Sequence, residues 1–194
     1  TAMAAQLDAA PVVLTIAAGI RIADLSRWLG GHARIVRAMP NTPALVGAGI
    51  SGAYAAHAVD AASRKLAGRV LKAAGSVLWV EREDMLDAVT GVSGSGPAYA
   101  FYFLEGLEQA ALELGFGRDD ARKLAYATFA GAIKLAMASD LDPGILRAQV
   151  TSKGGTTERA ITLMESEGVK AKFVAAVKAA AARARELGDE LGTG

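Results

Sequence analysis

Short apolar runs predict four β-strands in the first eighty-two residues. The first run, residues 11–19 (PVVLTIAAG), is β-branched and ends in small residues, which is typical of a buried parallel strand. Further runs lie at residues 33–43, 49–56 and 76–81. Pro40 and Pro43 end the strand predicted in residues 33–43, because proline cannot donate to a strand ladder.

Amphipathic segments between these runs predict helices. Residues 22–31 (IADLSRWLGG) predict a helix closed by glycine. Residues 60–75 predict another, with Asp60 as its N-cap and Gly75 as the C′ residue after its end. The alternation of strand and helix favours a doubly wound sheet in an α/β fold.

The pattern changes after about Glu81, where apolar positions follow helical spacing and no strand is predicted. Pro97 and Pro143 stand where first helical turns are expected, and a missing N–H costs nothing there. The helices are predicted near residues 84–92, 97–115, 119–138, 142–150, 156–167 and 169–190. The sequence therefore predicts an α/β part in residues 1–82 and an all-helical domain in residues 83–194.

Composition excludes several kinds of site. The 194 residues carry a net charge of +1, and no basic stripe alternates with aromatics, so nucleic-acid binding is not supported. The chain has no cysteine, and His32 and His57 lack ligand spacing, so neither a disulfide nor a metal site is expected. No apolar run reaches the roughly 18 residues of a membrane span, and no signal peptide opens the chain, so a cytoplasmic location is expected.

The first ten residues (TAMAAQLDAA) are typical of the end of an amphipathic helix, so we expect the chain to be a piece of a longer protein. A dinucleotide fold should carry G-x-G-x-x-G after its first strand. The nearest match, Gly94-x-Gly96 before Pro97, follows no predicted strand. It is better explained as a junction between two helices where glycines let backbones approach.

Two strand ends carry residues suited to a flat cofactor. Small Ala17, Ala18 and Gly19 follow the first strand, and Pro40 and Asn41 follow the second. Ligands of open α/β sheets bind outside such carboxyl ends. The alternatives are tight strand–helix packing at the first position and a capped turn at the second.

The segment VTSKGGTTERAITLME places glycines and hydroxyls before a run of helical spacing. Ser152 through Thr157 would lie at a helix N-terminus, which has free N–H groups and a partial positive charge. This chemistry suits a small carboxylate beside one polar atom that needs a proton. The alternative is an ordinary helix start, with threonine as N-cap and Glu158 in the first turn.

Two long motifs, AVTGVSGSGPAYAF and LRAQVTSKGGTTERAITLME, closely resemble the pyrroline-5-carboxylate reductase family, with IAAGI and MPNTPALVGAG at matching places upstream. The resemblance implies the C-terminal part of a Rossmann-type domain followed by a helical dimerisation domain. It implies reduction of 1-pyrroline-5-carboxylate to L-proline with NADPH or NADH, in a homodimer or a ring of dimers. The family's glycine fingerprint is absent, so the preference between the two cofactors stays open.

The resemblance also implies roles for individual residues. Thr157 matches the threonine whose hydroxyl hydrogen-bonds the imine nitrogen, and Ser152, Gly155 and Thr156 match positions that hold the substrate carboxylate. Glu83 matches an acidic position near the substrate. On the cofactor side the matching positions are Ala17, Ala18, Gly19, Pro40 and Asn41, with Gln149 near the ribose. Lys153 departs from the family, in which many members carry proline there.

Two other functions stay open at this point. A β-hydroxyacid or 6-phosphogluconate-type dehydrogenase would use a lysine as acid/base, and Lys123 and Lys134 are the candidates, although neither lies in a matching motif. The chain could also be a non-catalytic dimerisation module.

Overall fold

The computed structural model describes residues 11–192, so the predicted helix end at residues 1–10 lies outside the described residues. The chain divides into two compact units. Within the described residues, unit 1 comprises 11–97 and 175–192, and unit 2 comprises 98–174. The boundary after residue 82 that the sequence suggests stays a prediction.

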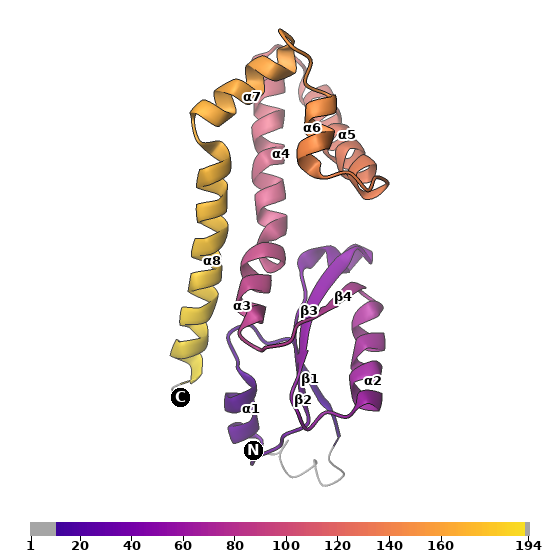
Figure 1. The fold of residues 1–194 in the computed structure, drawn as a ribbon, viewed down its shortest axis with the longest axis vertical. Helices are drawn as coiled ribbons and strands as arrows, with labels where there is room; N and C mark the ends of the chain where they lie inside the picture. The colour runs from indigo at the N-terminus through magenta and orange to yellow at the C-terminus, as the bar shows by residue number, and fades with distance from the viewer. Residues whose placement is uncertain (1–10, 193–194) are drawn as a thin grey trace. The chain divides into compact units, whose positions relative to one another are not determined.

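Unit 1 is built on a four-stranded sheet with the order β1-β2-β3-β4 (Figure 1). The strands are β1 (Val13–Thr15), β2 (Ile35–Met39), β3 (Gly49–Ala55) and β4 (Gly75–Trp79). All four were predicted, although β1 is shorter than expected because Ile16 through Gly19 have left the sheet. β1 and β2 are parallel, and so are β3 and β4.

The pair β2–β3 is antiparallel, so the sheet is mixed and not the uniformly parallel one that a doubly wound pattern implies. The reason lies in the connection. Only a 3₁₀ turn, Thr42–Val46, joins the two strands. A parallel crossover needs about a dozen or more residues, so the chain reverses here.

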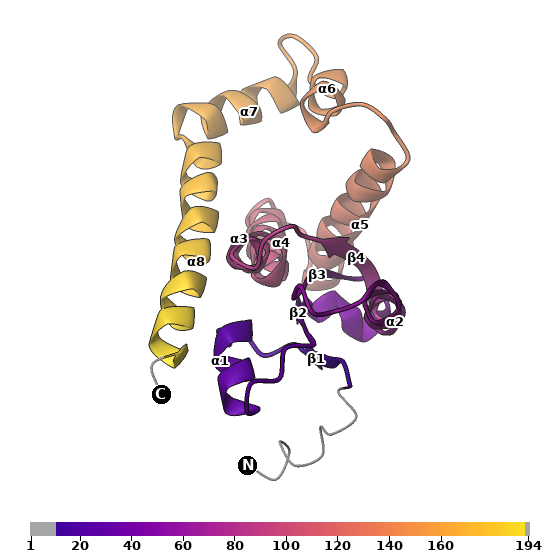
Figure 2. The ribbon, with the colours of Figure 1, turned by 60° about the horizontal axis from the view of Figure 1, so that its bottom comes forward.

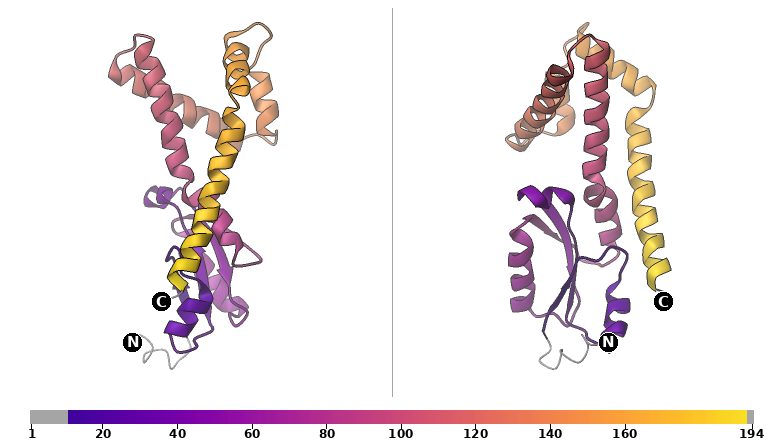
Figure 3. Two further views of the ribbon diagram at one scale, coloured as in Figure 1. Left: turned by 90° about the vertical axis from the view of Figure 1, so that its left-hand side faces the viewer. Right: turned by 180° about the vertical axis from the view of Figure 1, so that it is seen from behind.

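Helices cover both faces of the sheet (Figure 1, Figure 3). On one face α2 (Ala61–Lys72) packs over a small core of Ala38, Ala53 and Leu71. The predicted N-cap is confirmed, since Asp60 Oδ1 accepts the amide of Ser63 at 2.7 Å. The other face carries α1 (Ile22–Trp28) and α3 (Met85–Val89).

The predicted role of Gly75 as the C′ residue of α2 is wrong. Helix α2 ends at Lys72, and Gly75 is the first residue of β4, with φ +141°. It pairs with Gly49 of β3, and a Cβ at Gly75 would overlap the carbonyl oxygen of Gly49. The glycine is therefore required by the close approach of two strands and not by a helix end.

The remaining described residues are helical, as predicted. Their elements are α4 (Gly96–Glu113), α5 (Arg118–Met137), α6 (Pro143–Gln149), α7 (Thr156–Ser166) and α8 (Val169–Gly192). A π-helical turn, Thr90–Gly94, follows α3. Two helical segments do meet here, but the expectation that Gly94 and Gly96 let backbones approach is wrong. A Cβ at Gly94 would meet the Met39 side chain, and one at Gly96 would meet nothing within 4 Å. The close approach is at Gly91, where a Cβ would lie 2.8 Å from the backbone nitrogen of Ala181.

Unit 2 has few fully buried side chains. Phe173 packs edge-on against Tyr99 and Phe103, with ring centroids 5.6 Å apart in both pairs. The pair Arg147–Glu165, at 3.2 Å, joins α6 to α7. Large apolar side chains are open on its helices, among them Phe101, Tyr102, Ile133, Leu135, Met137 and Leu163. Many large apolar side chains left open to water are typical of a protein that covers them with a partner.

Candidate functional site

The loop after β1 carries the first group of predicted cofactor residues. Ala17 and Ala18 are exposed, and the amide of Ala17 is held by Thr15 Oγ1 at 3.2 Å. Gly19 has φ +73°, a left-handed conformation that side-chain-bearing residues rarely adopt. The loop therefore exposes two small side chains, Ala17 and Ala18, and its contact with a cofactor stays a prediction.

Pro40 and Asn41 follow β2, the parallel neighbour of β1, so both loops leave the same edge of the sheet. Asn41 Oδ1 accepts the amide of Ile50 at 2.9 Å, and this bond ties the start of the 3₁₀ turn to β3. Asn41 also occupies the N-cap position of that turn, without a capping bond from its side chain. Asn41 therefore stands where the capped-turn alternative puts it, but its side chain does not cap the turn. Its side-chain oxygen, Oδ1, instead holds the loop to β3.

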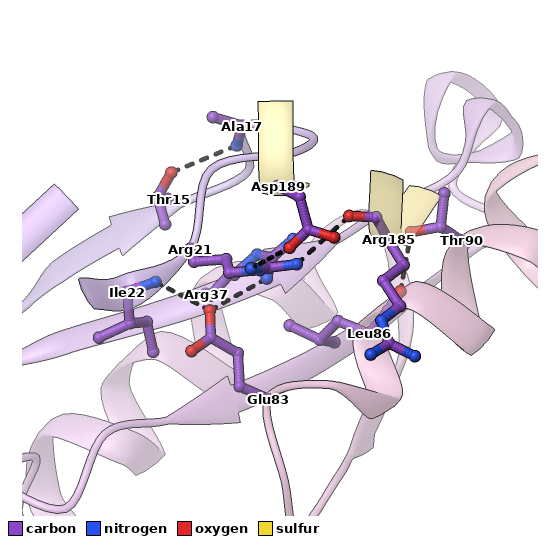
Figure 4. A network of polar contacts seen from close by, with 10 residues as sticks. All are labelled: Thr15, Ala17, Arg21, Ile22, Arg37, Glu83, Leu86, Thr90, Arg185 and Asp189. Atoms are coloured by element: carbon purple, nitrogen blue, oxygen red, sulfur yellow. Dashed lines mark hydrogen bonds and ion pairs between the residues drawn. The ribbon is translucent and has the colours of Figure 1, made fainter. Parts of the chain in front are cut away.

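Glu83 lies beside the end of the loop that follows β1 (Figure 4). Its Oε1 accepts the amide of Ile22, the first residue of α1, at 2.8 Å, and the guanidinium of Arg37 at 3.0 Å. The Arg37 side chain is only 8% exposed. Because a buried arginine needs a partner, Glu83 neutralises it and fixes the entry into α1 at the same time.

Sequence reasoning missed Arg21, which ends the β1 loop. Its Nη1 lies 2.7 Å from Asp189 Oδ1, and its Nη2 donates to the carbonyl oxygen of Arg185 at 3.2 Å (Figure 4). The hydrogen bond with Asp189 raises the pKa of Arg21. No local pattern could have revealed this pair, because its members come from opposite ends of the chain.

These side chains line a polar cavity of about 640 Å³ in unit 1. Asp87 also lines it, and burial raises the pKa of its carboxyl, against the opposing effect of Arg37 and Arg21. The full lining is Arg21, Arg37, Glu83, Asp84, Asp87, Ala181, Ala182, Arg185 and Asp189. Asp87 therefore loses charge more readily than an ordinary aspartate.

In unit 2, a tight turn precedes α7. The amide of Gly155 donates to the carbonyl of Ser152 at 3.0 Å, and Gly154, the third residue of the turn, has φ +74°. A type II turn requires that conformation at its third position. A Cβ at Gly155 would lie 2.5 Å from Ser152 Oγ, so glycine is what lets the hydroxyl sit against the backbone.

Helix α7 begins at Thr156, so Gly155 is its N-cap and the expectation of a threonine N-cap is wrong. No side chain caps the helix. Glu158 Oε2 accepts the amide of Gly154 at 2.6 Å, so this carboxylate is bound to the turn that precedes α7. Among residues 11–192, the hydroxyls of Thr156 and Thr157 have no hydrogen-bond partner, so both are available to a ligand.

Gln149 and Lys153 are exposed on either side of Ser152. Gln149 is the last residue of α6, whose end is held by the hydroxyl of Thr151 donating to the carbonyl of Arg147 at 2.6 Å. The predicted site residues therefore form two groups. Ala17, Ala18, Gly19, Pro40, Asn41 and Glu83 lie in unit 1, and Gln149, Ser152, Gly155, Thr156 and Thr157 lie in unit 2.

The part of the chain that spans residues 11–192 contains no cluster of three or more His, Cys, Asp or Glu side chains that could hold a metal ion. It also contains no helix with the length and apolarity needed to span a membrane.

Comparison with known proteins bears on both groups. The family model for pyrroline-5-carboxylate reductase dimerisation matches residues 83–187. The pyrroline-5-carboxylate reductase of Pseudomonas aeruginosa is 44% identical over 191 residues, which cover 98% of this chain and 70% of that protein.

Two solved structures are similar over most of this chain. The pyrroline-5-carboxylate reductase of Coxiella burnetii superposes with a TM-score of 0.86 at 42% identity, covering 91% of this chain and 65% of that one. The pyrroline carboxylate reductase of Plasmodium falciparum, solved with NADP bound, gives 0.84 at 29% identity, covering 91% and 71%. The chain thus spans about two thirds of the length of these proteins.

Proposed function

Because the chain belongs to the pyrroline-5-carboxylate reductase family of oxidoreductases, we propose that it reduces the ring C=N of 1-pyrroline-5-carboxylate to L-proline with NADPH or NADH. The observation that carries this proposal is the start of α7. There a glycine turn, an uncapped helix N-terminus and two free threonine hydroxyls occur together. This combination suits a small ring that carries one carboxylate and one basic nitrogen.

The substrate residues divide the work. The backbone of Gly155 and Thr156, at the positive end of α7, and the hydroxyl of Ser152 hold the carboxylate. The hydroxyl of Thr157 donates to the imine nitrogen. That bond draws electrons from the C=N bond, so the carbon accepts hydride more readily. The nitrogen takes the hydroxyl proton, and water returns a proton to the hydroxyl.

The residues of unit 1 fit a flat cofactor. Ala17 and Ala18 are small and exposed, Gly19 has the φ that a tight backbone turn needs, and Pro40 and Asn41 leave the sheet beside them. Gln149 is proposed to contact the ribose. When bound, the reduced nicotinamide supplies the hydride; the loops contribute a rigid surface that orients it and limits water.

Glu83 is proposed to act at the substrate side. Its Oε1 is engaged by Ile22 and Arg37, which leaves Oε2 as the oxygen available to a ligand. Substitution of Glu83 should therefore affect the KM for substrate as well as the fold, and Asp84→Asn, one residue on and exposed, is the matched control.

We propose that the protein is a cytoplasmic homodimer, either alone or as the unit of a ring of dimers. Two observations support the dimer: the match of residues 83–187 to the dimerisation model and the open apolar side chains of unit 2. Covering such surface removes apolar area from water, which drives association.

The test is oxidation of NADPH or NADH with 1-pyrroline-5-carboxylate, measured for this chain and for a version extended to the length of its relatives. We expect proline to form at the rate at which the cofactor is consumed. Oxidation of hydroxy acids by either version, without turnover of the pyrroline, would instead favour the dehydrogenase. Dimerisation without cofactor binding by the longer version would favour a non-catalytic module.

A further inference from the structure

We propose that the last turns of α8 position the cofactor-side loop, with Asp189 as the positioning residue. The loop in question is Ile16–Arg21, which carries Ala17, Ala18 and Gly19. This inference rests on the proposed function, because it assumes that the loop receives the nicotinamide cofactor. It adds to that function a control on cofactor affinity from the far end of the sequence.

The central contact is made by Arg21, whose guanidinium bonds two groups of α8. One guanidinium nitrogen reaches Asp189 Oδ1 at 2.7 Å, and the other donates to the carbonyl of Arg185 at 3.2 Å (Figure 4). Arg21 therefore has both a carboxylate and a backbone carbonyl of α8 as partners.

Glycines allow α8 to come this close. A Cβ at Gly188 would lie 3.0 Å from Nε of Arg21, and a Cβ at Gly19 would lie 2.7 Å from Cδ1 of Leu191. A side chain at Gly188 would displace the guanidinium of Arg21, and one at Gly19 would displace the end of the Leu191 side chain. The C-terminal end of α8 lies beside α1 in two views (Figure 2, Figure 3), consistent with these distances.

The next turn extends the contact onto α1. Arg27 Nη2 donates to the carbonyl of Gly192 at 2.9 Å, and Arg27 also pairs with Asp24 at 3.3 Å. The end of α8 thus contacts both the loop and the helix that follows it. A joint shift of the loop and α1 would break the contacts of α8 with Arg21 and with Arg27.

The opposite side of the loop is fixed by other groups. Thr15 Oγ1 holds the amide of Ala17, and Glu83 Oε1 holds the amide of Ile22. Arg21 is the third anchor and lies next to Ile22 in sequence. Without the Asp189 contact, the Arg21 side chain keeps only its 3.2 Å bond to the carbonyl of Arg185, so the backbone of Ala18 through Arg21 gains freedom.

The experiment compares Asp189→Asn with Glu190→Gln. The control removes the same charge one residue further on, where Glu190 pairs with Arg183 of the same helix at 2.7 Å. We expect Asp189→Asn to raise the KM for NADPH by about 5-fold or more, with kcat at saturating cofactor and the KM for the pyrroline unchanged. Asp189→Glu should restore most of the affinity.

A second readout reports the loop directly. Amide hydrogen exchange at residues 16–22 should speed up in Asp189→Asn and not in Glu190→Gln, while exchange at residues 41–50 stays the same in both. A merely structural role would speed up exchange across the whole of unit 1 and alter both KM values together.

The outcomes separate this inference from the proposed function. If the unmodified protein, tested at its relatives' length, neither binds NADPH nor reduces the pyrroline, the proposed function fails and the inference fails with it. If it does both, and Asp189→Asn matches Glu190→Gln in NADPH affinity and loop exchange, only the inference is overturned.

Discussion

Arg37 and the amide of Ile22 share a single acceptor, Oε1 of Glu83. The arginine is buried on β2, and the carboxylate comes from the segment between β4 and α3. One oxygen thus links the sheet, the first residue of α1 and the start of α3. The geometry makes Glu83 a structural centre of unit 1, whatever it contributes to a substrate.

Removing that carboxylate should be costly. Glu83→Ala leaves the Arg37 guanidinium buried without its partner, and we expect a loss of about 3 kcal/mol in the free energy of unfolding. Urea denaturation measures it. The double variant Arg37→Met with Glu83→Leu should recover much of the loss, because it buries no charge. Equal stability of Glu83→Ala and the unmodified chain would contradict this account.

The pairing of Gly75 with Gly49 leads to a second prediction. Gly75→Ala would place a methyl group on the carbonyl of Gly49 and strain a φ of +141°, so β3 and β4 must separate. We expect a loss above roughly 3 kcal/mol. Gly68→Ala is the matched control in α2. Its Cβ would meet Trp79 at an ordinary 3.6 Å, so it should gain up to about 1 kcal/mol of helix propensity.

Gly75 also shows where sequence reasoning reaches its limit. The apolar runs predicted all four strands, and Asp60 was identified as an N-cap because both signals are local. Gly75 follows a helix, so its sequence context favoured a helix end. Its actual role depends on Gly49, which another strand supplies.

In the candidate site, too, the local features were predicted and the contacts between distant residues were not. The strand-end loops and the α7 turn were predicted from neighbouring residues. The hold of Asp189 on Arg21 was not, because periodicity does not specify which distant carboxylate meets an arginine. The direction of β3 was within reach of the sequence, because only five residues separate the runs at 33–43 and 49–56, too few for a parallel crossover.

Lys153 occupies the second position of the Ser152–Gly155 turn, where proline is common in type II turns. Lys153→Pro should stabilise the turn by about 0.4–1 kcal/mol by restricting the unfolded chain. Gly154→Ala is the contrast, because its φ of +74° strains any side chain. Thermal unfolding distinguishes them, and a fall in melting temperature for Lys153→Pro would show that the turn has another geometry.

Two aspartates should give unit 1 opposite responses to pH. The backbone amide of Ser63 lowers the pKa of Asp60 below its ordinary 3.8. Its stabilising effect is therefore present above that pH and is lost as pH falls through the lowered value. Unfolding of Asp60→Asn and the unmodified chain, followed from pH 6 downward, should differ at first and converge under acid.

For Asp87 the dependence of stability on pH has the opposite sign. Burial raises its pKa, so its ionised form disfavours folding, and full stability exists only below the unfolded value of 3.8. Asp87→Asn should accordingly be more stable than the unmodified chain near pH 7, with the gain disappearing as pH falls. A gain that persisted in acid would mean that packing, and not charge, is responsible.

Thr157 offers the sharpest test of the chemistry. Its hydroxyl has no partner among the described residues, so Thr157→Val removes a donor without breaking a hydrogen bond that the described fold uses. The shapes of the two side chains are nearly the same. If the hydroxyl polarises the imine, kcat should fall on the order of 10²-fold, with the KM for NADPH little changed. Steady-state kinetics with 1-pyrroline-5-carboxylate measures both.

Two further variants locate that effect in the hydroxyl of Thr157. Thr157→Ser keeps the donor and should retain most of the rate. Thr156→Val removes the neighbouring hydroxyl but keeps the backbone amide to which the carboxylate role is assigned, so its kcat should stay close to that of the unmodified chain. If Thr156→Val and Thr157→Val lost rate equally, the effect would not be specific to Thr157, and its assignment as the donor to the imine nitrogen would be overturned.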